Sequence, residues 1–288
     1  MADSPTVALL GGGMLGQALL EGALASGEWP AGAFRVTTGR EESARRVRER
    51  FGVACGTGDA NAVEGAGLVL LCVKPRTLPS VCRAIAPALA AGVPVVSCAA
   101  GVPLADLRSW LPESAAVIRA MPNLPCRVRS GMTVLCPAEG VPEEATARAE
   151  TFFQSLGRVR RLGEEHLDTV TGLSASGPAF LYLVLESLTD GGVMAGLPRG
   201  AAMELAAQTT LGAARMVLET GEHPAALKDA VTTPAGCTIS ALLKLEDGRL
   251  RSVLARAVEE AARAAAGLRP QTRSGGPPTP APPPEEAP

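Results

Sequence analysis

The sequence predicts an α/β fold, with a doubly wound sheet in the N-terminal part of the chain and an all-α region after it. From residue 6 to about residue 160, short apolar segments alternate with helical ones, which is typical of a parallel sheet covered by helices on both faces. After about residue 165 these strand-like segments stop, and long segments rich in Ala and Leu indicate helices. Because only 3% of the 288 residues are aromatic, Leu, Val and Ala must form most of the core.

The strands are expected at 6–10, 34–38, 68–73, 93–98, 115–119, 131–135 and 158–162. Between them, helices are expected near 14–26, 41–51, 77–91, 104–111 and 142–156. The all-α region is expected to contain helices at 167–195, 199–220 and 250–267. Helices this apolar around their circumference pack either against a partner chain or into an intramolecular bundle, and the pattern leaves both open.

Composition excludes several classes of protein. A net charge of −2 gives no reason to expect a nucleic acid or an acidic membrane surface as partner. The N-terminus has no basic leader and no apolar run is long enough to span a bilayer, so a cytoplasmic protein is expected. The seven cysteines form no C-x-x-C pair and no metal-ligand spacing with the two histidines, which favours free thiols and no metal site.

A glycine-rich segment follows the first expected strand. Gly11, Gly13 and Gly16 form a G-x-G-x-x-G pattern at the start of a helix, with Met14 and Leu15 inside it. Gly11 allows a tight turn, Gly13 lets the backbone approach a pyrophosphate, and Gly16 allows close packing of helix on strand. The alternative is a loop that only turns the chain. The position between strand and helix favours a Rossmann dinucleotide site.

The residues at the end of the second expected strand indicate which dinucleotide binds. An NAD site usually has Asp or Glu there, to bind the ribose 2′-hydroxyl. This chain instead has Thr38 and Arg40, which suit a 2′-phosphate, so NADPH is favoured and NADH remains an alternative. A solvated surface arginine would also explain Arg40.

Later expected strands end in residues suited to a cofactor crevice. Ligands of open α/β sheets bind at the carboxyl ends of the strands. The candidates are Val73, Lys74 and Pro75 in "VKP", Ala99 and Ala100 in "SCAAGV", and Asn123 in "RAMPNLP". Each could be an ordinary tight loop, but as a set they indicate one crevice.

The stretch "TTPAGCT", residues 232–238, interrupts the all-α region. A turn between two helices would explain it. Alternatively, Thr238 begins a new helix whose free backbone amides attract a carboxylate. An earlier break, "SASGP", contains Ser176 and is compatible with either helix packing or a substrate contact.

Up to about residue 268 the chain resembles the pyrroline-5-carboxylate reductase family, in particular its cytosolic animal form. The resemblance is carried by the glycine pattern, by "VKP" at 73–75, "SCAAGV" at 97–102 and "TGLSASGPAF" at 171–180, and by the spacing from Gly236 and Thr238 to Glu246. It implies a Rossmann domain over 1–164 and a helical dimerisation and substrate domain over 165–268. The remaining residues, 269–288, are expected to be a disordered Pro-rich tail.

The resemblance also implies a reaction and a set of site residues. NAD(P)H would reduce the cyclic imine 1-pyrroline-5-carboxylate to L-proline, the last step of proline biosynthesis, in a homodimer that assembles into a larger ring. Thr238 would be the catalytic residue, contacting the ring nitrogen. The substrate would be bound by Glu164, Ser176, Thr233, Gly236, Cys237 and Thr238, and Asn61 would join the cofactor-binding residues named above.

Some positions depart from the family, and two other functions are alternatives. Ala235 and Cys237 replace frequent family residues in the substrate loop, and Ala230 and Gly221 differ nearby. A β-hydroxyacid dehydrogenase would need a lysine after the "SASG" break, but no lysine occurs between Lys74 and Lys228. A non-catalytic NADPH sensor would not need an intact substrate loop.

Overall fold

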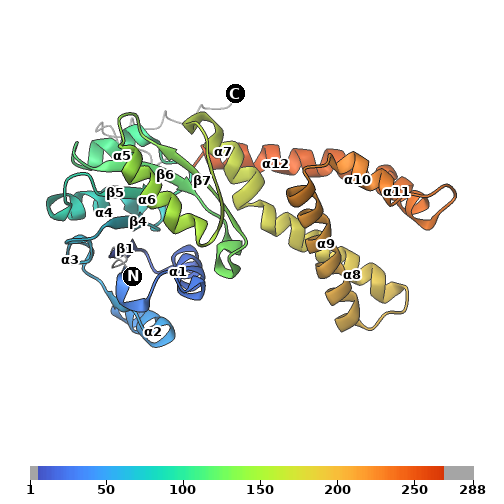
Figure 1. Cartoon of the computed structure of the whole chain (residues 1–288), viewed down its shortest axis with the longest axis horizontal. Coiled ribbons are helices and arrows are strands. Elements are labelled where there is room, and N and C mark those ends of the chain that lie inside the picture. Colours follow the sequence, from blue (N-terminus) through green and yellow to red (C-terminus); the bar gives the residue numbers. More distant parts are fainter. Residues whose placement is uncertain (1–5, 269–288) are drawn as a thin grey trace, which may run out of the picture.

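The computed structural model describes residues 6–268 and places an eight-stranded sheet in the N-terminal part of the chain (Figure 1). The order of the strands is β3-β2-β1-β4-β5-β6-β7-β8. They are β1 (Val7–Leu10), β2 (Phe34–Thr37), β3 (Ala54–Gly56), β4 (Leu68–Leu71), β5 (Pro94–Ser97), β6 (Ala116–Met121), β7 (Gly131–Pro137) and β8 (Gly157–Arg161). The predicted doubly wound α/β domain followed by an all-α domain is confirmed.

Helices cover both faces of this sheet, which is why the central strands are apolar without alternation. They are α1 (Met14–Ser26), α2 (Glu41–Phe51), α3 (Asp59–Val63), α4 (Leu78–Ile85), α5 (Leu104–Trp110) and α6 (Glu143–Gln154). On one face, Leu19 of α1 and Phe152 of α6 pack in a core cluster with Leu9. On the other, Ile85 of α4 and Leu107 of α5 pack against residues of β1, β4 and β5.

The last two strands correct the expectation of a fully parallel sheet. Strands β1 to β6 run parallel to their neighbours, but β7 is antiparallel to β6, and β8 is parallel to β7. Only residues 122–130 connect β6 to β7, too short a link for a helical crossover, so the chain folds back beside the strand it has left. The link from β7 to β8 contains α6, and this crossover restores the parallel direction.

Two further differences have local causes. The short elements β3 and α3 were not predicted, because three to five residues carry too little periodicity to be recognised. The helix expected near 77–91 ends at Ile85 and continues as a 3₁₀ turn over Ala86–Ala88. Pro87 lacks the backbone N–H that the α-helical ladder would need.

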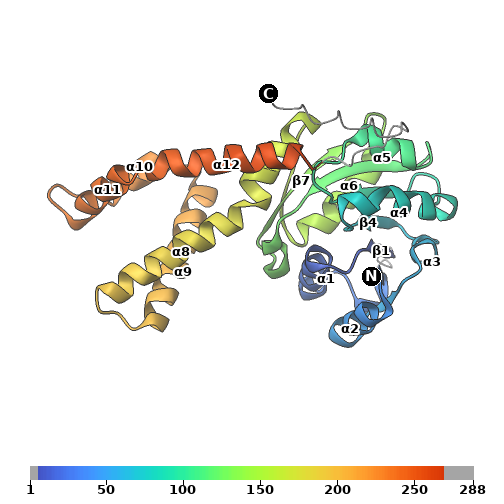
Figure 2. The ribbon, with the colours of Figure 1, turned by 180° about the vertical axis from the view of Figure 1, so that it is seen from behind.

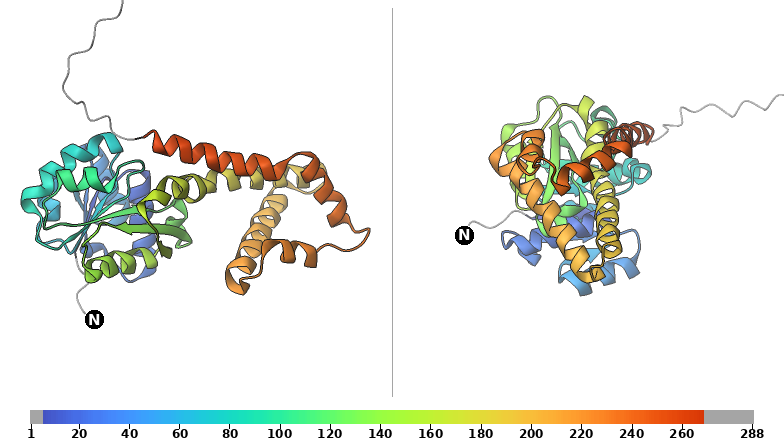
Figure 3. Two further views of the ribbon diagram at one scale, coloured as in Figure 1. Left: turned by 90° about the horizontal axis from the view of Figure 1, so that it is seen from above. Right: turned by 90° about the vertical axis from the view of Figure 1, so that its right-hand side faces the viewer.

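The all-α region extends away from the sheet as an arm (Figures 2 and 3). Its helices are α7 (Leu167–Val170), α8 (Gly177–Met194), α9 (Arg199–Thr220), α10 (Pro224–Ala230), α11 (Cys237–Asp247) and α12 (Leu250–Ala266). Helices α8 and α9 pack on each other, and α12 returns to pack against α7. Helices α10 and α11 lie at the end of the arm farthest from the sheet (Figure 1).

A π-helical turn over Thr171–Ala175 breaks the single helix expected over 167–195. The backbone N–H of Ser176 bonds to the carbonyl of Thr171 at 2.9 Å, one residue farther than in an α-helix. Pro178 has no N–H to offer the carbonyl of Ser174. That carbonyl instead accepts a hydrogen bond from Asn123 Nδ2 at 3.2 Å, so the irregular turn ties the arm to the sheet domain.

Many apolar side chains of the arm are uncovered. Met194 is 90% exposed, and Leu183 and Leu243 are 65% and 59% exposed. A packed monomer rarely exposes so many large apolar side chains in one region, so this arm favours a partner chain over an intramolecular bundle. No helix within residues 6–268 combines the length and the apolar character needed to cross a bilayer. The expected tail, 269–288, lies outside the described residues.

Candidate functional site

The glycine-rich loop forms a tight turn between β1 and α1. Gly11 has φ +110°, and a Cβ there would lie 2.6 Å from the carbonyl oxygen of Cys72. A Cβ on Gly16 would overlap the carbonyl oxygen of Gly11. A Cβ on Gly13, in contrast, would meet nothing within 4 Å. The absence of a side chain at Gly13 therefore serves no packing need of the protein and leaves room beside the first turn of α1 for a bound group.

A cavity of 460 Å³ lies next to this loop, at the carboxyl ends of β1, β2 and β4. Six of the predicted cofactor-binding residues line it: Gly11, Gly13, Thr38, Arg40, Val73 and Lys74. They come from three chain segments that are far apart in the sequence. The structure thus brings the glycine loop, the end of the second strand and the "VKP" segment to one cavity.

Three positively charged side chains that line this cavity have no protein partner in the described part of the chain. Within residues 6–268, the side chains of Arg40, Lys74 and Arg76 take part in no hydrogen bond or ion pair. The hydroxyl of Thr38 bonds to the carbonyl of Arg40 at 2.9 Å and shapes the turn before α2. Three unpaired cations near free backbone amides fit the phosphates of a dinucleotide.

An acidic group lines the same cavity. Asp59, the first residue of α3, accepts a hydrogen bond from Thr37 Oγ1 at 2.5 Å. Its carboxylate is therefore beside the end of β2, where dinucleotide-binding proteins place an acid for the ribose. The cavity combines features that favour a 2′-phosphate with one that favours a 2′-hydroxyl.

Other predicted cofactor residues lie outside this cavity. Asn61 is exposed in an adjacent depression, and Met14 lines a separate cavity with Tyr182 of α8. Leu15 packs against the core cluster on the α1 face. Pro75 begins the 3₁₀ turn after Lys74, at the rim of the dinucleotide cavity.

Ala99, Ala100 and Asn123 follow the ends of β5 and β6, closer to the arm. Ala99 is buried and Ala100 half-buried, in a loop that passes through Gly101 at φ +71°. Asn123 Oδ1 accepts a hydrogen bond from the backbone of Met132 at 2.9 Å, while Nδ2 donates to Ser174. These loops therefore lie at the root of the arm, between the dinucleotide cavity and the helices.

The predicted substrate residues separate into two groups. Glu164 and Ser176 lie at the root of the arm, where Glu164 bonds to Arg119 of β6 and the turn before Ser176 bonds to Asn123. Thr233 and Gly236 lie in the connection between α10 and α11, and Cys237 and Thr238 are the first residues of α11. This connection is at the end of the arm farthest from the sheet (Figure 1). One chain therefore does not bring its own 233–238 loop to its own dinucleotide cavity.

The 233–238 loop has a defined shape. Ala235 has φ +57°, the left-handed region that glycine adopts more easily. Helix α11 begins at Cys237 with Gly236 as its N-cap, one residue earlier than predicted, because Gly236 has the extended backbone that precedes a first helical turn. A Cβ on Gly236 would overlap the hydroxyl of Thr233. Thr238 is the second residue of α11 and is half-buried.

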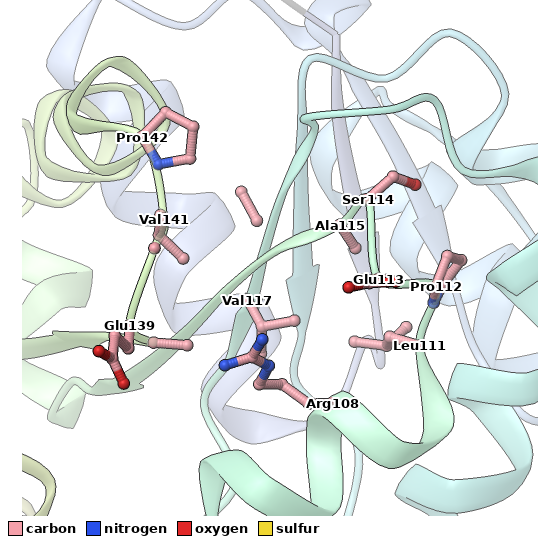
Figure 4. A pocket seen from close by; sticks show the side chains of 13 residues that line it. Arg108, Leu111, Pro112, Glu113, Ser114, Ala115, Val117, Glu139, Val141 and Pro142 are labelled. Carbon is pink, nitrogen blue, oxygen red and sulfur yellow. The ribbon is translucent and has the colours of Figure 1, made fainter.

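Another cavity, of 670 Å³, lies at the opposite edge of the sheet, where β6 begins and β7 ends (Figure 4). Arg108, Glu113 and Glu139 are among its lining side chains. It contains none of the predicted site residues, and it is far from the carboxyl ends of the parallel strands. Within residues 6–268, no group of three His, Cys, Asp or Glu side chains is arranged to hold a metal ion, and the seven cysteines are free thiols.

Sequence reasoning missed several residues of the dinucleotide cavity. They are Gly12, Thr37, Gly39, Ser43, Thr57, Asp59, Cys72, Arg76, Thr77 and Val81. Arg76 could have been found from its position two residues after Lys74. In the segment 59–61 the prediction selected Asn61, whereas the structure places Asp59 in the cavity, because the register of this segment depends on the unpredicted elements β3 and α3.

The fold and this cavity define a two-domain oxidoreductase of the dinucleotide-binding Rossmann class. The chain is 39% identical over 262 residues to the pyrroline-5-carboxylate reductase of Glycine max, covering 91% of this chain and 95% of the relative. It belongs to the pyrroline-5-carboxylate reductase family. Residues 164–268 match the family model described as pyrroline-5-carboxylate reductase dimerisation, and residues 6–101 match that of NADP oxidoreductase, coenzyme F420-dependent.

Solved structures are similar over nearly the whole chain. A pyrroline-5-carboxylate reductase from Coxiella burnetii has a TM-score of 0.83 at 31% identity, covering 92% of this chain and 99% of that one. The Plasmodium falciparum pyrroline carboxylate reductase, solved with NADP bound, has a TM-score of 0.84 at 25% identity, covering 93% and 99%. The predicted preference for NADPH, with NADH as an alternative, agrees with these matches.

Proposed function

We propose that this protein reduces 1-pyrroline-5-carboxylate to L-proline with NADPH, the last step of proline biosynthesis. The observation that carries the proposal is the dinucleotide cavity, in a chain that shares fold and sequence with the reductases over its two domains. The proposed domains are a dinucleotide-binding domain over 1–164 and a dimerisation and substrate domain over 165–268.

Bound NADPH would supply a hydride to the imine carbon, and a proton completes the amine. The proposed cofactor residues are those lining the cavity, together with Met14, Leu15, Asn61, Pro75, Ala99, Ala100 and Asn123. Because the protonated cyclic imine is already electrophilic, orientation can provide most of the rate enhancement. Thr238 would orient the ring nitrogen by a hydrogen bond, and the free amides at the start of α11 would hold the substrate carboxylate.

The partner subunit would complete each site. The 233–238 loop lies far from its own dinucleotide cavity, the arm exposes apolar side chains, and residues 164–268 match a dimerisation domain. We infer an intertwined homodimer in which the loop of one chain reaches the cavity of its partner. Thr233, Gly236, Cys237 and Thr238 would then meet Ser176 at the root of the partner's arm. Assembly of such dimers into a larger ring is part of the proposal.

Purified protein mixed with NADPH and 1-pyrroline-5-carboxylate tests the activity. NADPH absorbance should fall and L-proline should form in equal amount. NADPH binding without turnover would instead support a cofactor-binding sensor. Turnover with a β-hydroxyacid and not with the imine would support the dehydrogenase alternative, which the absence of lysine between Lys74 and Lys228 argues against.

Mixing two impaired variants tests the shared site. Gly13→Ala damages only the dinucleotide cavity, and Thr238→Ala damages only the loop. If each site combines two chains, mixed dimers contain one site with both parts intact, and activity rises above that of either variant. If each chain forms its own site, every site in the mixture keeps one defect and mixing restores nothing. Light scattering of the full chain gives the size of the assembly.

Cytoplasmic location and the cytosolic animal subtype are also proposals. Seven free thiols suit a reducing compartment. Fractionation of cells that express the full chain tests the location.

A further inference from the structure

The loop between β5 and α5, residues 98–103, contains Ala99 and Ala100 and is held from two sides by the root of the arm. On one side, Glu164 Oε1 accepts a hydrogen bond from the backbone N–H of Leu104 at 2.6 Å. On the other, the last turn of α12 packs so closely that a Cβ on Gly101 would lie 2.8 Å from the carbonyl oxygen of Ala265. The loop therefore contacts Glu164, directly before the helical domain, and Ala265, near the end of that domain.

Glu164 also bonds to a buried cation. Arg119 Nη1 donates to the same Oε1 atom at 2.7 Å, and the Arg119 side chain is only 6% exposed. Arg119 lies in the middle of β6, beside Ser97 in β5 and Cys136 in β7. Its Nη2 atom is buried without a hydrogen-bond partner. A buried guanidinium needs a counter-ion, and within residues 6–268 Glu164 is the acid that forms an ion pair with it.

These contacts give Glu164 a structural role inside the protein, although its side chain is still 37% exposed. Its Oε1 oxygen accepts hydrogen bonds from two donors, the backbone N–H of Leu104 at the start of α5 and the guanidinium of Arg119 in β6. The carboxylate links the root of the arm to β6 and to the start of α5.

We propose that Glu164 and Arg119 are positioning residues that hold the 98–103 loop in the shape required by the nicotinamide end of the cofactor. This inference rests on the proposed function, because it places the nicotinamide at Ala99 and Ala100. The phosphates and the adenosine would bind separately, at the glycine loop and Arg40. Loosening the pair should therefore displace the nicotinamide while the cofactor remains bound.

The test compares Glu164→Gln, Glu164→Asp and Arg119→Lys in the full-length protein. Glu143→Gln is the matched control, since it removes one acid of an exposed ion pair with Arg161 on the same domain. Three quantities are measured for each variant: the Kd for NADPH, the fluorescence of the bound nicotinamide, and kcat with KM for the imine. The fluorescence reports the nicotinamide environment without requiring turnover.

For Glu164→Gln, kcat should fall about tenfold to a hundredfold, since a displacement of about 1 Å can cost that much. The Kd for NADPH should change less than threefold, while the fluorescence of the bound nicotinamide shifts. Glu164→Asp keeps the charge and should recover part of kcat and of the fluorescence. Arg119→Lys should resemble Glu164→Gln in direction, and Glu143→Gln should resemble the unmodified protein.

Two results would overturn the inference. A rise in KM for the imine alone, with unchanged nicotinamide fluorescence, would make Glu164 a substrate contact. Unchanged kcat and fluorescence in Glu164→Gln would show that the pair does not position the loop. Failure of the proposed function can be told apart from failure of this inference. In the first case the unmodified protein would not reduce the imine, and the fluorescence of bound nicotinamide would still report the shape of the loop. If Glu164→Gln does not fold, the same measurements on Glu164→Asp and Arg119→Lys test the inference.

Discussion

Thr37 Oγ1 donates a hydrogen bond to Asp59 Oδ1 over 2.5 Å, on the wall of the cavity that also contains Arg40. The bond fixes a carboxylate at the end of β2, where Rossmann domains bind the 2′-hydroxyl or 2′-phosphate of the adenosine ribose. A carboxylate favours a 2′-hydroxyl, whereas Arg40 favours a 2′-phosphate. The two side chains therefore act in opposite directions on the choice between NADH and NADPH.

Asp59→Asn should raise the preference for NADPH. Removing one negative charge near a phosphate contributes about 1 kcal/mol in a solvated site, or about fivefold in the ratio of kcat/KM for NADPH to that for NADH. Steady-state rates with both cofactors measure this ratio. Asn61→Ala serves as the comparison, because Asn61 faces the adjacent depression. If Asn61→Ala changes the ratio and Asp59→Asn does not, Asn61 is the ribose contact.

Gly13→Ala should fold normally but lose affinity for the cofactor. A Cβ at Gly13 meets no protein atom within 4 Å, so thermal unfolding without cofactor should be unchanged. The same Cβ would occupy the space of a pyrophosphate, and the Kd for NADPH should rise at least tenfold, which corresponds to about 1.4 kcal/mol. Gly32→Ala, also in open space but away from the cavity, should leave the Kd unchanged. Equal NADPH affinity in both variants would contradict the placement of the phosphates.

Ala235→Gly should relieve backbone strain in the substrate loop. The left-handed conformation at φ +57° costs a non-glycine residue about 1–2 kcal/mol, part of which the flexibility of glycine in the unfolded chain offsets. We expect the free energy of unfolding in urea to be equal or greater. The KM for the imine should change less than threefold, because the net change in strain energy is small. Ala255→Gly, in the interior of α12, should instead destabilise by about 0.5–1 kcal/mol. Destabilisation by Ala235→Gly would show that this strain is absent in solution.

Thr238→Ala should lower kcat/KM for the imine by about tenfold to a hundredfold, the loss of one or two hydrogen bonds. The affinity for NADPH should be retained, because Thr238 lies outside the dinucleotide cavity of its own chain. Ser240→Ala, at an exposed position of the same helix, is the control. Steady-state kinetics at low substrate concentration measure the effect. Normal turnover in Thr238→Ala would remove this hydroxyl from the site.

Stability should fall at alkaline pH in part through Cys82. Burial raises the pKa of the Cys82 thiol to about 12, above the value of about 8.5 in an unfolded chain. Between these values the folded state keeps the proton and the unfolded state releases it, so the free energy of unfolding decreases as the pH rises. The slope from one such thiol is at most about 1.4 kcal/mol per pH unit. Urea unfolding at several pH values should give a shallower decline for Cys82→Ala; identical slopes would contradict the shift.

Much of the fold could be predicted because its signals are local. The period of apolar residues separates strands from helices, and glycine at positions 11, 13 and 16 marks the turn where a phosphate approaches. The same local signals identified the interrupted segment at 232–238. The direction of β7 was not predictable in this way, since periodicity reports where a strand lies and not how it pairs.

The sequence by itself determined the two-domain organisation, the glycine loop and the candidate residues for binding a cofactor and a substrate. Only the tertiary structure decided which of them meet. It places Asp59 beside Thr37, ties Glu164 to Arg119, and carries Thr238 away from the cavity of its own chain. The physical reason is that these contacts join residues distant in the chain, and they depend on strand order and on how the helices pack, which no local pattern encodes.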